Sequence, residues 1–228
     1  MQTAGAKNLI ICHNKTPGNT IFNAKDFFRV LYGAGYITEK IGEINYRLSA
    51  MSFFQVNTTQ TEILYNIAAD FAAAIPRQSL IIDAHAGVGG TALIAAHRNL
   101  AETIIGIDII KPAVTDATTN ATLNNLTNTE FICGAAEEII PALLTQGDNN
   151  IPDTIFLDPP RKGCDPALLQ AIITADVSKI VYISCEPSTL ARDVKILQGF
   201  YSVKSVKTVD MFPMTGKVEI VALLELKR

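Results

Sequence analysis

The feature that most constrains this chain is the alternation of short apolar runs with amphipathic stretches from about residue 62 onward. The apolar runs are rich in β-branched side chains, as buried strands are, and the stretches between them have helical length and spacing. Repeated strand and helix units of this kind build a parallel sheet covered by helices on both faces. We predict seven strands, at 80–83, 103–108, 129–133, 154–158, 180–184, 203–210 and 218–226, and helices at 91–98, 112–124, 137–144, 166–174 and 188–198.

The last two predicted strands have no helix between them. Residues 211–217, which include Pro213 and Gly216, connect them by a tight reversal, so the seventh strand should run antiparallel to its neighbour. A seven-stranded, mostly parallel sheet with an antiparallel last strand is typical of methyltransferases rather than of a symmetric dinucleotide-binding sheet. We therefore expect an α/β fold of the Rossmann-like class I methyltransferase type.

Residues 1–50 are less regular than the rest. Their short apolar runs, separated by Gly and Asn, suggest hairpins. They hold six Lys/Arg against three Asp/Glu, whereas residues 51–228 hold thirteen against nineteen, so the positive charge is concentrated at the amino end. We interpret residues 1–50 as part of a substrate-side segment and residues 51–228 as the catalytic domain.

Length and composition favour one compact domain. The 228 residues are 48% hydrophobic and 18% charged, and their apolar runs are far shorter than the roughly 18 residues that suggest a membrane span. No basic segment followed by an apolar stretch marks the amino terminus for export, and the four cysteines lack the spacing of a metal site. We expect a monomer in the cytoplasm, with reduced thiols, no metal and no membrane contact.

A glycine-rich loop, DAHAGVGGT at residues 83–91, follows the first predicted strand and opens a helix. Gly87 and Gly89 let the backbone approach a ligand closely. Asp108 ends the next strand 19 residues after Gly89, where an acidic side chain can accept hydrogen bonds from ribose hydroxyls. The loop predicts a nucleotide cofactor. It leaves a nicotinamide-dependent oxidoreductase as an alternative, because residues 87–92 also fit GxGxxA.

The fourth predicted strand ends in Asp158, followed by Pro159, Pro160 and Arg161. Ligands of open α/β sheets bind beyond the carboxyl ends of the strands, and two stiff prolines hold the Asp158 carboxylate there. Arg161 stands where methyltransferases that act on exocyclic amines place an aromatic ring. Methylation of an amine is therefore disfavoured.

A cysteine follows the fifth predicted strand. Cys185 lies just before a helix that begins at Pro187, where free backbone N–H groups and the helix dipole lower the pKa of a thiol. This placement predicts a reactive nucleophile, with Cys164 as a weaker second candidate. Cys133, inside a predicted strand, is expected to be a buried structural thiol.

Glu219 lies at the start of the last predicted strand, between Val218 and Ile220. Because this strand is antiparallel, its start should lie at the edge where Asp158 and Cys185 end their strands. An acidic side chain in apolar surroundings indicates a functional group. An ion pair with Lys217 is the alternative interpretation.

These motifs, with SFFQVN at residues 52–57, resemble the RNA (uracil-5-)-methyltransferase family, which includes bacterial ribosomal and transfer RNA enzymes. The resemblance extends from about Asn8 to the carboxyl end. It implies S-adenosylmethionine as cofactor, an rRNA or tRNA substrate methylated at carbon 5 of a uridine, Cys185 as nucleophile and Glu219 as base. We assign the cofactor contacts to Gln55, His85, Gly87, Gly89, Asp108 and Asp158.

The chain departs from the family pattern at His85, Ala86, Ala135, Met214 and Lys217. The family's amino-terminal RNA-binding barrel is not found in this sequence, and the isoelectric point is about 5.6, so we expect the chain alone to bind RNA weakly. A methyltransferase for another substrate and a non-catalytic RNA-binding paralogue are the alternatives. Retention of Cys185 and Glu219 argues against the paralogue, and an oxidoreductase would explain neither residue.

Overall fold

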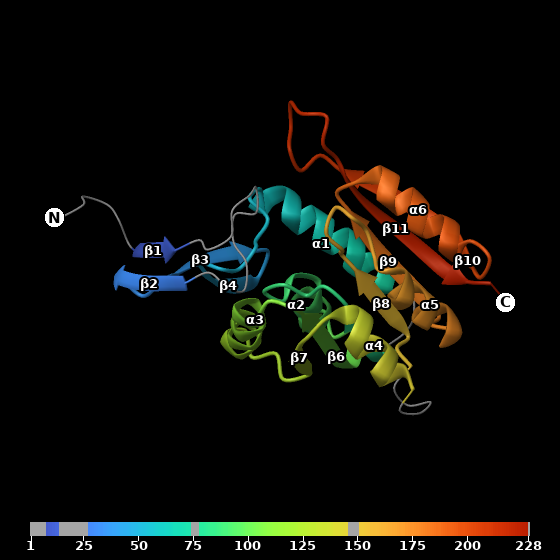
Figure 1. Cartoon of the computed structure of the whole chain (residues 1–228), viewed down its shortest axis with the longest axis horizontal. Helices are drawn as coiled ribbons and strands as arrows, with labels where there is room; N and C mark the ends of the chain where they lie inside the picture. The colour runs from blue at the N-terminus through green and yellow to red at the C-terminus, as the bar shows by residue number, and fades with distance from the viewer. Residues whose placement is uncertain (1–7, 14–26, 74–77, 146–150, 228) are drawn as a thin grey trace.

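The computed structural model describes residues 8–13, 27–73, 78–145 and 151–227. A central seven-stranded sheet has the strand order β10-β11-β9-β8-β5-β6-β7 (Figure 1). Its strands are β5 (Gln78–Asp83), β6 (Ala101–Asp108), β7 (Thr129–Cys133), β8 (Thr154–Leu157), β9 (Lys179–Ser184), β10 (Tyr201–Val209) and β11 (Glu219–Leu226).

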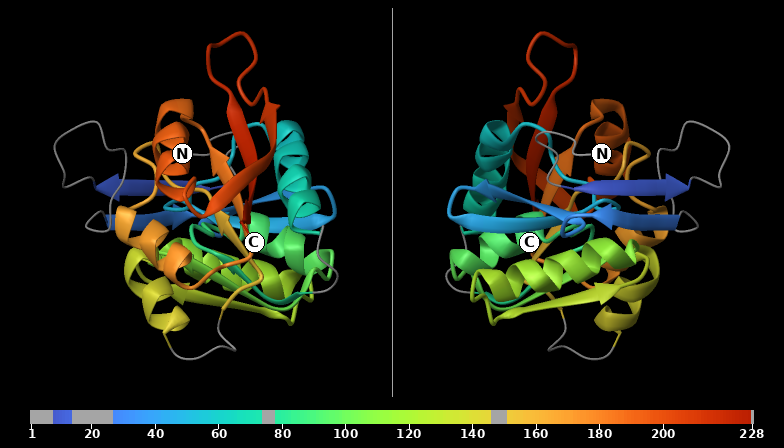
Figure 2. Two further views of the ribbon diagram at one scale, coloured as in Figure 1. Left: turned by 90° about the vertical axis from the view of Figure 1, so that its right-hand side faces the viewer. Right: turned by 90° about the vertical axis from the view of Figure 1, so that its left-hand side faces the viewer.

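Six helices cover the two faces of this sheet, as the end-on views of Figure 2 show. One face is packed by α1 (Thr58–Ala72), α2 (Gly90–His97) and α3 (Lys111–Leu123), and the other by α4 (Ala136–Leu144), α5 (Pro166–Thr174) and α6 (Pro187–Leu197). Each face has its own hydrophobic cluster, so every residue of β8 and β9 is buried. Continuous apolar runs are therefore required in these strands.

The strands from β5 to β9 pair in parallel, whereas β11 runs antiparallel to both β9 and β10. The predicted α/β fold with an antiparallel last strand is confirmed. The predicted strand ends lie within two residues of the observed ones, and the ends of the five predicted helices lie within one. Among the described residues, no helix is both long enough and apolar enough to cross a membrane.

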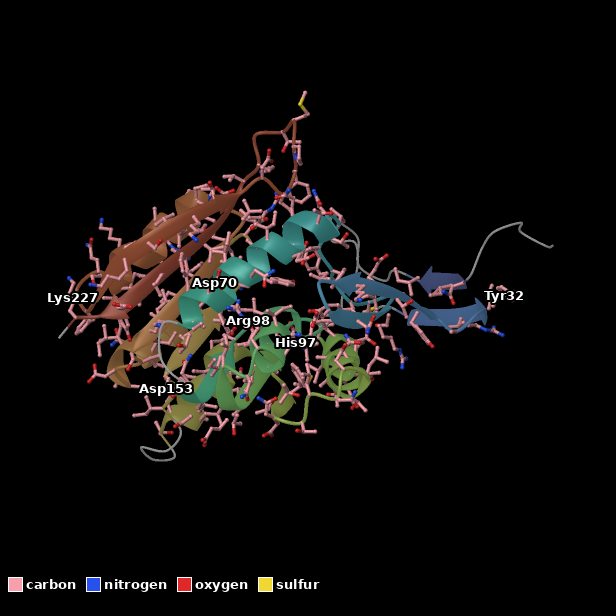
Figure 3. The ribbon with its side chains drawn as sticks, turned by 180° about the vertical axis from the view of Figure 1, so that it is seen from behind. Tyr32, Asp70, His97, Arg98, Asp153 and Lys227 are labelled. Carbon is pink, nitrogen blue, oxygen red and sulfur yellow. The ribbon has the colours of Figure 1, made fainter. Side chains whose placement is uncertain are left out.

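Helix α1 is fixed at both ends. Asn57 caps its first turn by accepting a hydrogen bond from Gln60 N at 3.2 Å. At its last turn the buried Lys179 Nζ donates to Phe71 O at 3.1 Å, and the Arg98 guanidinium pairs with Asp70 at 2.8 Å (Figure 3). These contacts hold the helix against the sheet and against α2.

Two antiparallel hairpins precede α1. The first joins β1 (Leu9–His13) to β2 (Phe27–Tyr32) and extends away from the sheet, with Tyr32 64% exposed (Figures 1 and 3). The second joins β3 (Tyr36–Ile41) to β4 (Ile44–Ser49). The second hairpin buries its apolar side chains in the same cluster as α1 and α2, at Ile41, Ile44, Tyr46 and Leu48.

The free edge of β4 is paired by side chains of α3 rather than by another strand. Asn124 exchanges hydrogen bonds of 2.9 and 2.7 Å with the backbone of Asn45, and Asn120 exchanges bonds of 2.6 and 3.2 Å with the backbone of Arg47. Asp116 accepts from Ser49 N at 2.7 Å.

The spacing of these side chains along the helix matches the spacing of their partners along the strand. Asp116 and Asn120 on α3 and Asn124 at its carboxyl cap are four residues apart, a rise of about 6 Å along a helix. Their partners on β4 are two residues apart, about 6.6 Å along a strand. The two repeats are nearly equal, so one helix face satisfies the edge of the hairpin. Asn120 also donates to Val88 O at 3.1 Å, which connects the hairpin to the glycine-rich loop.

We expect Asn120→Ala to lower the free energy of unfolding by about 2–3 kcal/mol, because it leaves buried backbone groups without partners. Asn124→Ala is the matched control, since it removes the same pair of backbone bonds one turn later at an exposed position. Water can replace those bonds, so its cost should be about 0.5–1 kcal/mol. Urea unfolding measures both, and equal losses would contradict the prediction.

Candidate active site

The glycine-rich loop between β5 and α2 is held by Asp108. Gly87 and Gly89 have positive φ angles of 54° and 96°, which favour glycine. Gly87 N donates to Asp108 Oδ2 at 2.9 Å and Ile110 N donates to Asp108 Oδ1 at 2.7 Å. Each oxygen keeps a second lone pair for a ligand. A Cβ built on Gly87 would meet nothing within 4 Å, so the space over this residue is open.

Asp83 fixes the start of α2. Its carboxylate is fully buried and accepts hydrogen bonds from the Thr91 hydroxyl, from Ala92 N at 3.1 Å and from His85 N at 3.3 Å. Burial outweighs these bonds and raises the pKa of Asp83 to about 6. This residue therefore anchors the loop.

A narrow hollow lies against this loop. It is lined by residues 86–88, 90 and 91 of the loop region and by Phe53, Phe54, Gln55, Tyr65, His85 and Asp158. With its open mouth it measures about 370 Å³. On its 53–55 side, Phe53 is 75% exposed, whereas Phe54 packs against the core beside Tyr46 and Gln55 is nearly buried.

His85 lies in the wall of this hollow. Burial lowers the pKa of its imidazole to about 4, so the ring is neutral at pH 7. Its Nδ1 atom is buried without a hydrogen-bond partner among the described residues. A buried polar atom of this kind favours a polar ligand in the hollow.

The antiparallel return of β11 brings Glu219 to the same edge as Asp158 and Cys185. Ile220 pairs with Ser184, so Glu219 lies beside Cys185 on the neighbouring strand. Glu219 is only 4% exposed. It forms no ion pair with the exposed Lys217 in the described part of the chain, so the alternative interpretation is wrong.

The carboxyl groups at this edge are shifted toward their neutral forms. Burial raises the pKa of Glu219, and the nearby Arg161 guanidinium partly opposes this shift. The pKa of Asp158 is raised well above its usual range by burial and by the charges of Asp83 and Glu219. Both carboxylates are therefore stronger bases than ordinary exposed carboxylates.

The pKa expected for Cys185 is wrong in this structure. We expected the helix start to lower it, but burial and the carboxylates of Glu219 and Asp158 raise it, and Arg161 only partly opposes them. Burial is the largest cause of this rise, and the two carboxylates add to it. The thiol is therefore neutral without a substrate, and a thiolate must form within the complex.

The other described cysteines have different surroundings. Cys133 is exposed at the end of the edge strand β7, so its expected burial is wrong. Cys164 is buried, and burial raises the pKa of its thiol to about 12. Its backbone N donates to Asp193 Oδ2 at 2.8 Å, and Tyr182 Oη donates to the same atom at 2.7 Å. Cys164 thus belongs to the contact that holds the 158–163 loop on α6.

The departures from the family pattern are spread around the site. Only His85 and Ala86 line the hollow. Ala135 precedes α4, and Met214 and Lys217 are exposed in the 211–217 reversal. The changes at the last three positions therefore leave the wall of the hollow intact.

Sequence reasoning missed two contributors. Tyr65 lines the hollow from α1, and its only sequence signal was the amphipathic pattern that also marks core aromatics. Asp193 lies fully buried on α6, where Arg192 Nη2 donates to its Oδ1 at 2.7 Å. A single sequence gives no sign of such a long-range anchor.

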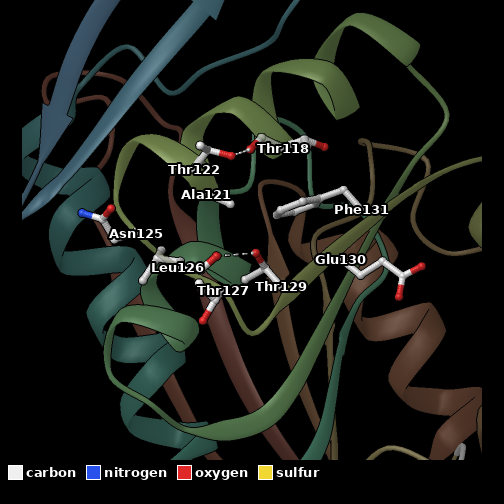
Figure 4. Close-up of a pocket in the computed structure, with 9 residues that line it drawn as sticks. All are labelled: Thr118, Ala121, Thr122, Asn125, Leu126, Thr127, Thr129, Glu130 and Phe131. Atoms are coloured by element: carbon white, nitrogen blue, oxygen red, sulfur yellow. Dashed lines mark hydrogen bonds between the residues drawn. The ribbon is translucent and has the colours of Figure 1, made fainter.

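A larger hollow, about 1040 Å³ with its open mouth, lies elsewhere. Its lining comes from the end of α3, the following loop and β7: Thr118, Ala121, Thr122, Asn125, Leu126, Thr127, Thr129, Glu130 and Phe131 (Figure 4). It reaches the amino-terminal start of β7, whereas Asp108, Asp158 and Cys185 lie at the carboxyl ends of their strands. Because the reactive groups lie at the carboxyl ends of the strands, we take the smaller hollow as the candidate site.

The strand order, the glycine-rich loop and the acidic carboxyl edge define the chain as a protein of the Rossmann-like methyltransferase fold. The family model described as tRNA (Uracil-5-)-methyltransferase matches residues 28–227, and the chain belongs to this family. The expected family is thereby confirmed.

Curated relatives agree with this membership. Proteins named as uncharacterized RNA methyltransferases from Bacillus cereus and Oceanobacillus iheyensis are 44% and 43% identical over 96% and 97% of the chain. A third, from Listeria innocua, is 44% identical over 95% of the chain. The alignments cover 47% of each relative, so the chain spans about half the length of the curated relatives it matches.

Solved structures share the fold. The tRNA (uracil-54, C5)-methyltransferase of Pyrococcus abyssi, in complex with S-adenosyl-L-homocysteine, has a TM-score of 0.74 and 29% identity. The match covers 92% of this chain and 49% of that one. TYW2 of M. jannaschii, in complex with AdoMet, has a TM-score of 0.58 over 88% of this chain and 91% of its own; at 15% identity it supports the fold alone.

The raised pKa of Asp83 predicts a pH-dependent stability. The native state holds this proton more tightly than the unfolded chain, so the contribution is present below about pH 4 and is lost as pH rises through about 6. Relative to Asp83→Asn, which cannot titrate, the wild type should lose about 3 kcal/mol of unfolding free energy between pH 4 and 7. Urea unfolding at several pH values gives this difference, and a pH-independent difference would refute the assignment.

Proposed function

We propose that the chain is the catalytic part of an S-adenosylmethionine-dependent RNA methyltransferase that forms 5-methyluridine. The main supporting observation is that a cysteine, Cys185, and two carboxylates, Asp158 and Glu219, lie close together beside the glycine-rich hollow. Family membership supports the RNA substrate and the uracil specificity.

The residues of the hollow fit the cofactor. The Asp108 carboxylate is held at the loop with free lone pairs, as a ribose diol requires, and the space over Gly87 admits close approach. The unpartnered Nδ1 of His85 and the nearly buried amide of Gln55 supply further polar contacts. When bound, S-adenosylmethionine supplies an electrophilic methyl group on a positively charged sulfur.

Cys185 is assigned as the nucleophile. Carbon 5 of uracil is a weak nucleophile, so a thiolate first adds to carbon 6 and the electron pair of the 5,6 double bond moves into an enolate. The neutral thiol of Cys185 gives its proton to the neighbouring Asp158 carboxylate, whose raised pKa suits it to this task. Carbon 5 of the enolate then takes the methyl group.

Glu219 is assigned as the base that completes the cycle. It removes the proton from carbon 5, the double bond reforms and the Cys185 sulfur leaves as thiolate. Glu219 lies across from Cys185, and burial raises the pKa of its carboxyl group. A uridine must leave its stack to reach this edge.

The proposal includes a ribosomal or transfer RNA as partner, a monomeric state and action in the cytoplasm, where these RNAs are used. The division into a substrate-side segment, residues 1–50, and a catalytic domain, residues 51–228, is part of it. Because the β3–β4 hairpin packs into the catalytic core, we assign the substrate-side role to the β1–β2 hairpin, whose residues 29–32 are exposed. A different methyl acceptor is the alternative, and a non-catalytic paralogue gains no support from the clustered reactive groups.

Cofactor binding tests the first part of the proposal. We expect S-adenosylhomocysteine to bind and nicotinamide dinucleotide not to bind. Asp108→Ala should weaken binding by about 1.5–3 kcal/mol, the range for hydrogen bonds to a charged group. Isothermal calorimetry measures both. A heat of binding with nicotinamide dinucleotide, and none with S-adenosylhomocysteine, would overturn the methyltransferase assignment.

Covalent trapping tests the assigned chemistry. Cys185→Ala should form no adduct with uridine-containing RNA, and methyl transfer should fall by several orders of magnitude. Glu219→Gln keeps the size of the side chain but removes the base, so a methylated protein–RNA adduct should accumulate. Denaturing electrophoresis with labelled cofactor shows both, with 5-fluorouridine RNA as the trap for the wild type.

Cys133→Ala is the matched control, because this exposed thiol also ends a strand at the carboxyl edge of the sheet but lies on the edge strand β7. It should behave as the wild type. An adduct in Cys185→Ala would place the nucleophile elsewhere. Full turnover by Glu219→Gln would leave Glu219 without a role as base.

A further inference from the structure

Tyr65 is a nearly buried aromatic residue in the lining of the hollow. It projects from the middle of α1, is only 7% exposed and shares the lining with Gly90 and Asp158. A Cβ built on Gly90 would lie 2.5 Å from the Tyr65 hydroxyl oxygen, so the phenol packs directly on the first residue of α2. Glycine is required at position 90 for this contact.

The Tyr65 hydroxyl has no hydrogen-bond partner among the described residues. It is nevertheless close enough to Asp83, Asp158 and Glu219 for their charges to raise its pKa, together with burial. Asp158 likewise receives no hydrogen bond from the described groups. A nearly buried hydroxyl and a carboxylate, both unpartnered, thus face the same small space.

This end of the hollow is acidic, and the nearest positive side chains, Arg161 and Lys162, lie outside its lining. No lysine or arginine of the described chain lines the hollow, and His85 is neutral. The Arg161 guanidinium lowers the pKa values of Glu219 and Cys185 but does not offset the raised pKa of Asp158. Asp158 is half-buried, and a ligand that brings a positive charge stabilises a carboxylate in such a position.

We propose that the Tyr65 hydroxyl contacts the bound cofactor at its sulfur and, with Asp158, makes this site selective for a positively charged sulfonium over the neutral thioether product. The inference rests on the proposed function. The hydroxyl oxygen directs a lone pair toward the sulfonium, and the Asp158 carboxylate supplies the opposite charge. Loss of the methyl group removes the positive charge, so the product loses this attraction and leaves.

Calorimetric affinities for three ligands test the proposal on the complete chain. They are S-adenosylmethionine, S-adenosylhomocysteine and sinefungin, whose protonated amine replaces the sulfonium. Tyr65→Phe keeps the ring on Gly90 and should weaken the two cationic ligands about tenfold while changing S-adenosylhomocysteine less than twofold. Asp158→Asn should weaken the cationic ligands by more than tenfold with the same selectivity.

Tyr46→Phe is the matched control. Tyr46 is another buried tyrosine whose hydroxyl reaches Gly90, donating to its carbonyl oxygen at 3.4 Å, but it does not line the hollow. It should leave all three affinities unchanged. Equal weakening of charged and neutral ligands by Tyr65→Phe, or no weakening at all, would overturn the selectivity. A wild type that binds none of the three would instead overturn the proposed function.

Discussion

The pairing of β11 with β9 is the interaction on which the site depends. A parallel sheet brings only the carboxyl ends of its strands to the reactive edge, as for Asp158 and Cys185. Because β11 runs the other way, its first residue, Glu219, reaches that edge. A shift of one residue along β11 would turn Glu219 to the other face of the sheet. The buried side chains of β11 on both faces hold the register and thereby the distance between thiol and base.

A second set of contacts joins the hairpin, α3 and the glycine-rich loop into one unit. Asn120 bonds both to β4 and to Val88, and Asp108 bonds both to Gly87 and to the start of α3. These contacts are hydrogen bonds between backbone and side-chain groups. They therefore fix the relative positions of the hairpin, α3 and the loop without burying a large apolar area. The glycine-rich loop is thus held in place both by the hairpin and helix α3 and by Asp108.

Burial is the common cause of the pKa shifts at the site. It raises the pKa values of Asp83, Asp158, Glu219 and Cys185, and nearby negative charges add to the shifts of Asp158 and Cys185. Arg161 is the side chain whose positive charge opposes the shifts of Glu219 and Cys185. A thiol beside carboxylates whose pKa values are raised suits a reaction in which protons must be exchanged between the cysteine, the carboxylates and the substrate.

The sequence by itself determined the strands, the helices and the edge at which the reactive residues lie, because hydrophobic periodicity and strand direction are local properties. It also placed Cys185, Asp158 and Glu219 at one edge, since the helix-free reversal at 211–217 required an antiparallel last strand. Only the tertiary structure decided the charge of the Cys185 thiol, the position of Tyr65 on Gly90 and the attachment of β4 to α3. Electrostatic shifts and side-chain contacts depend on groups distant in the chain, whose separation in space no local pattern encodes.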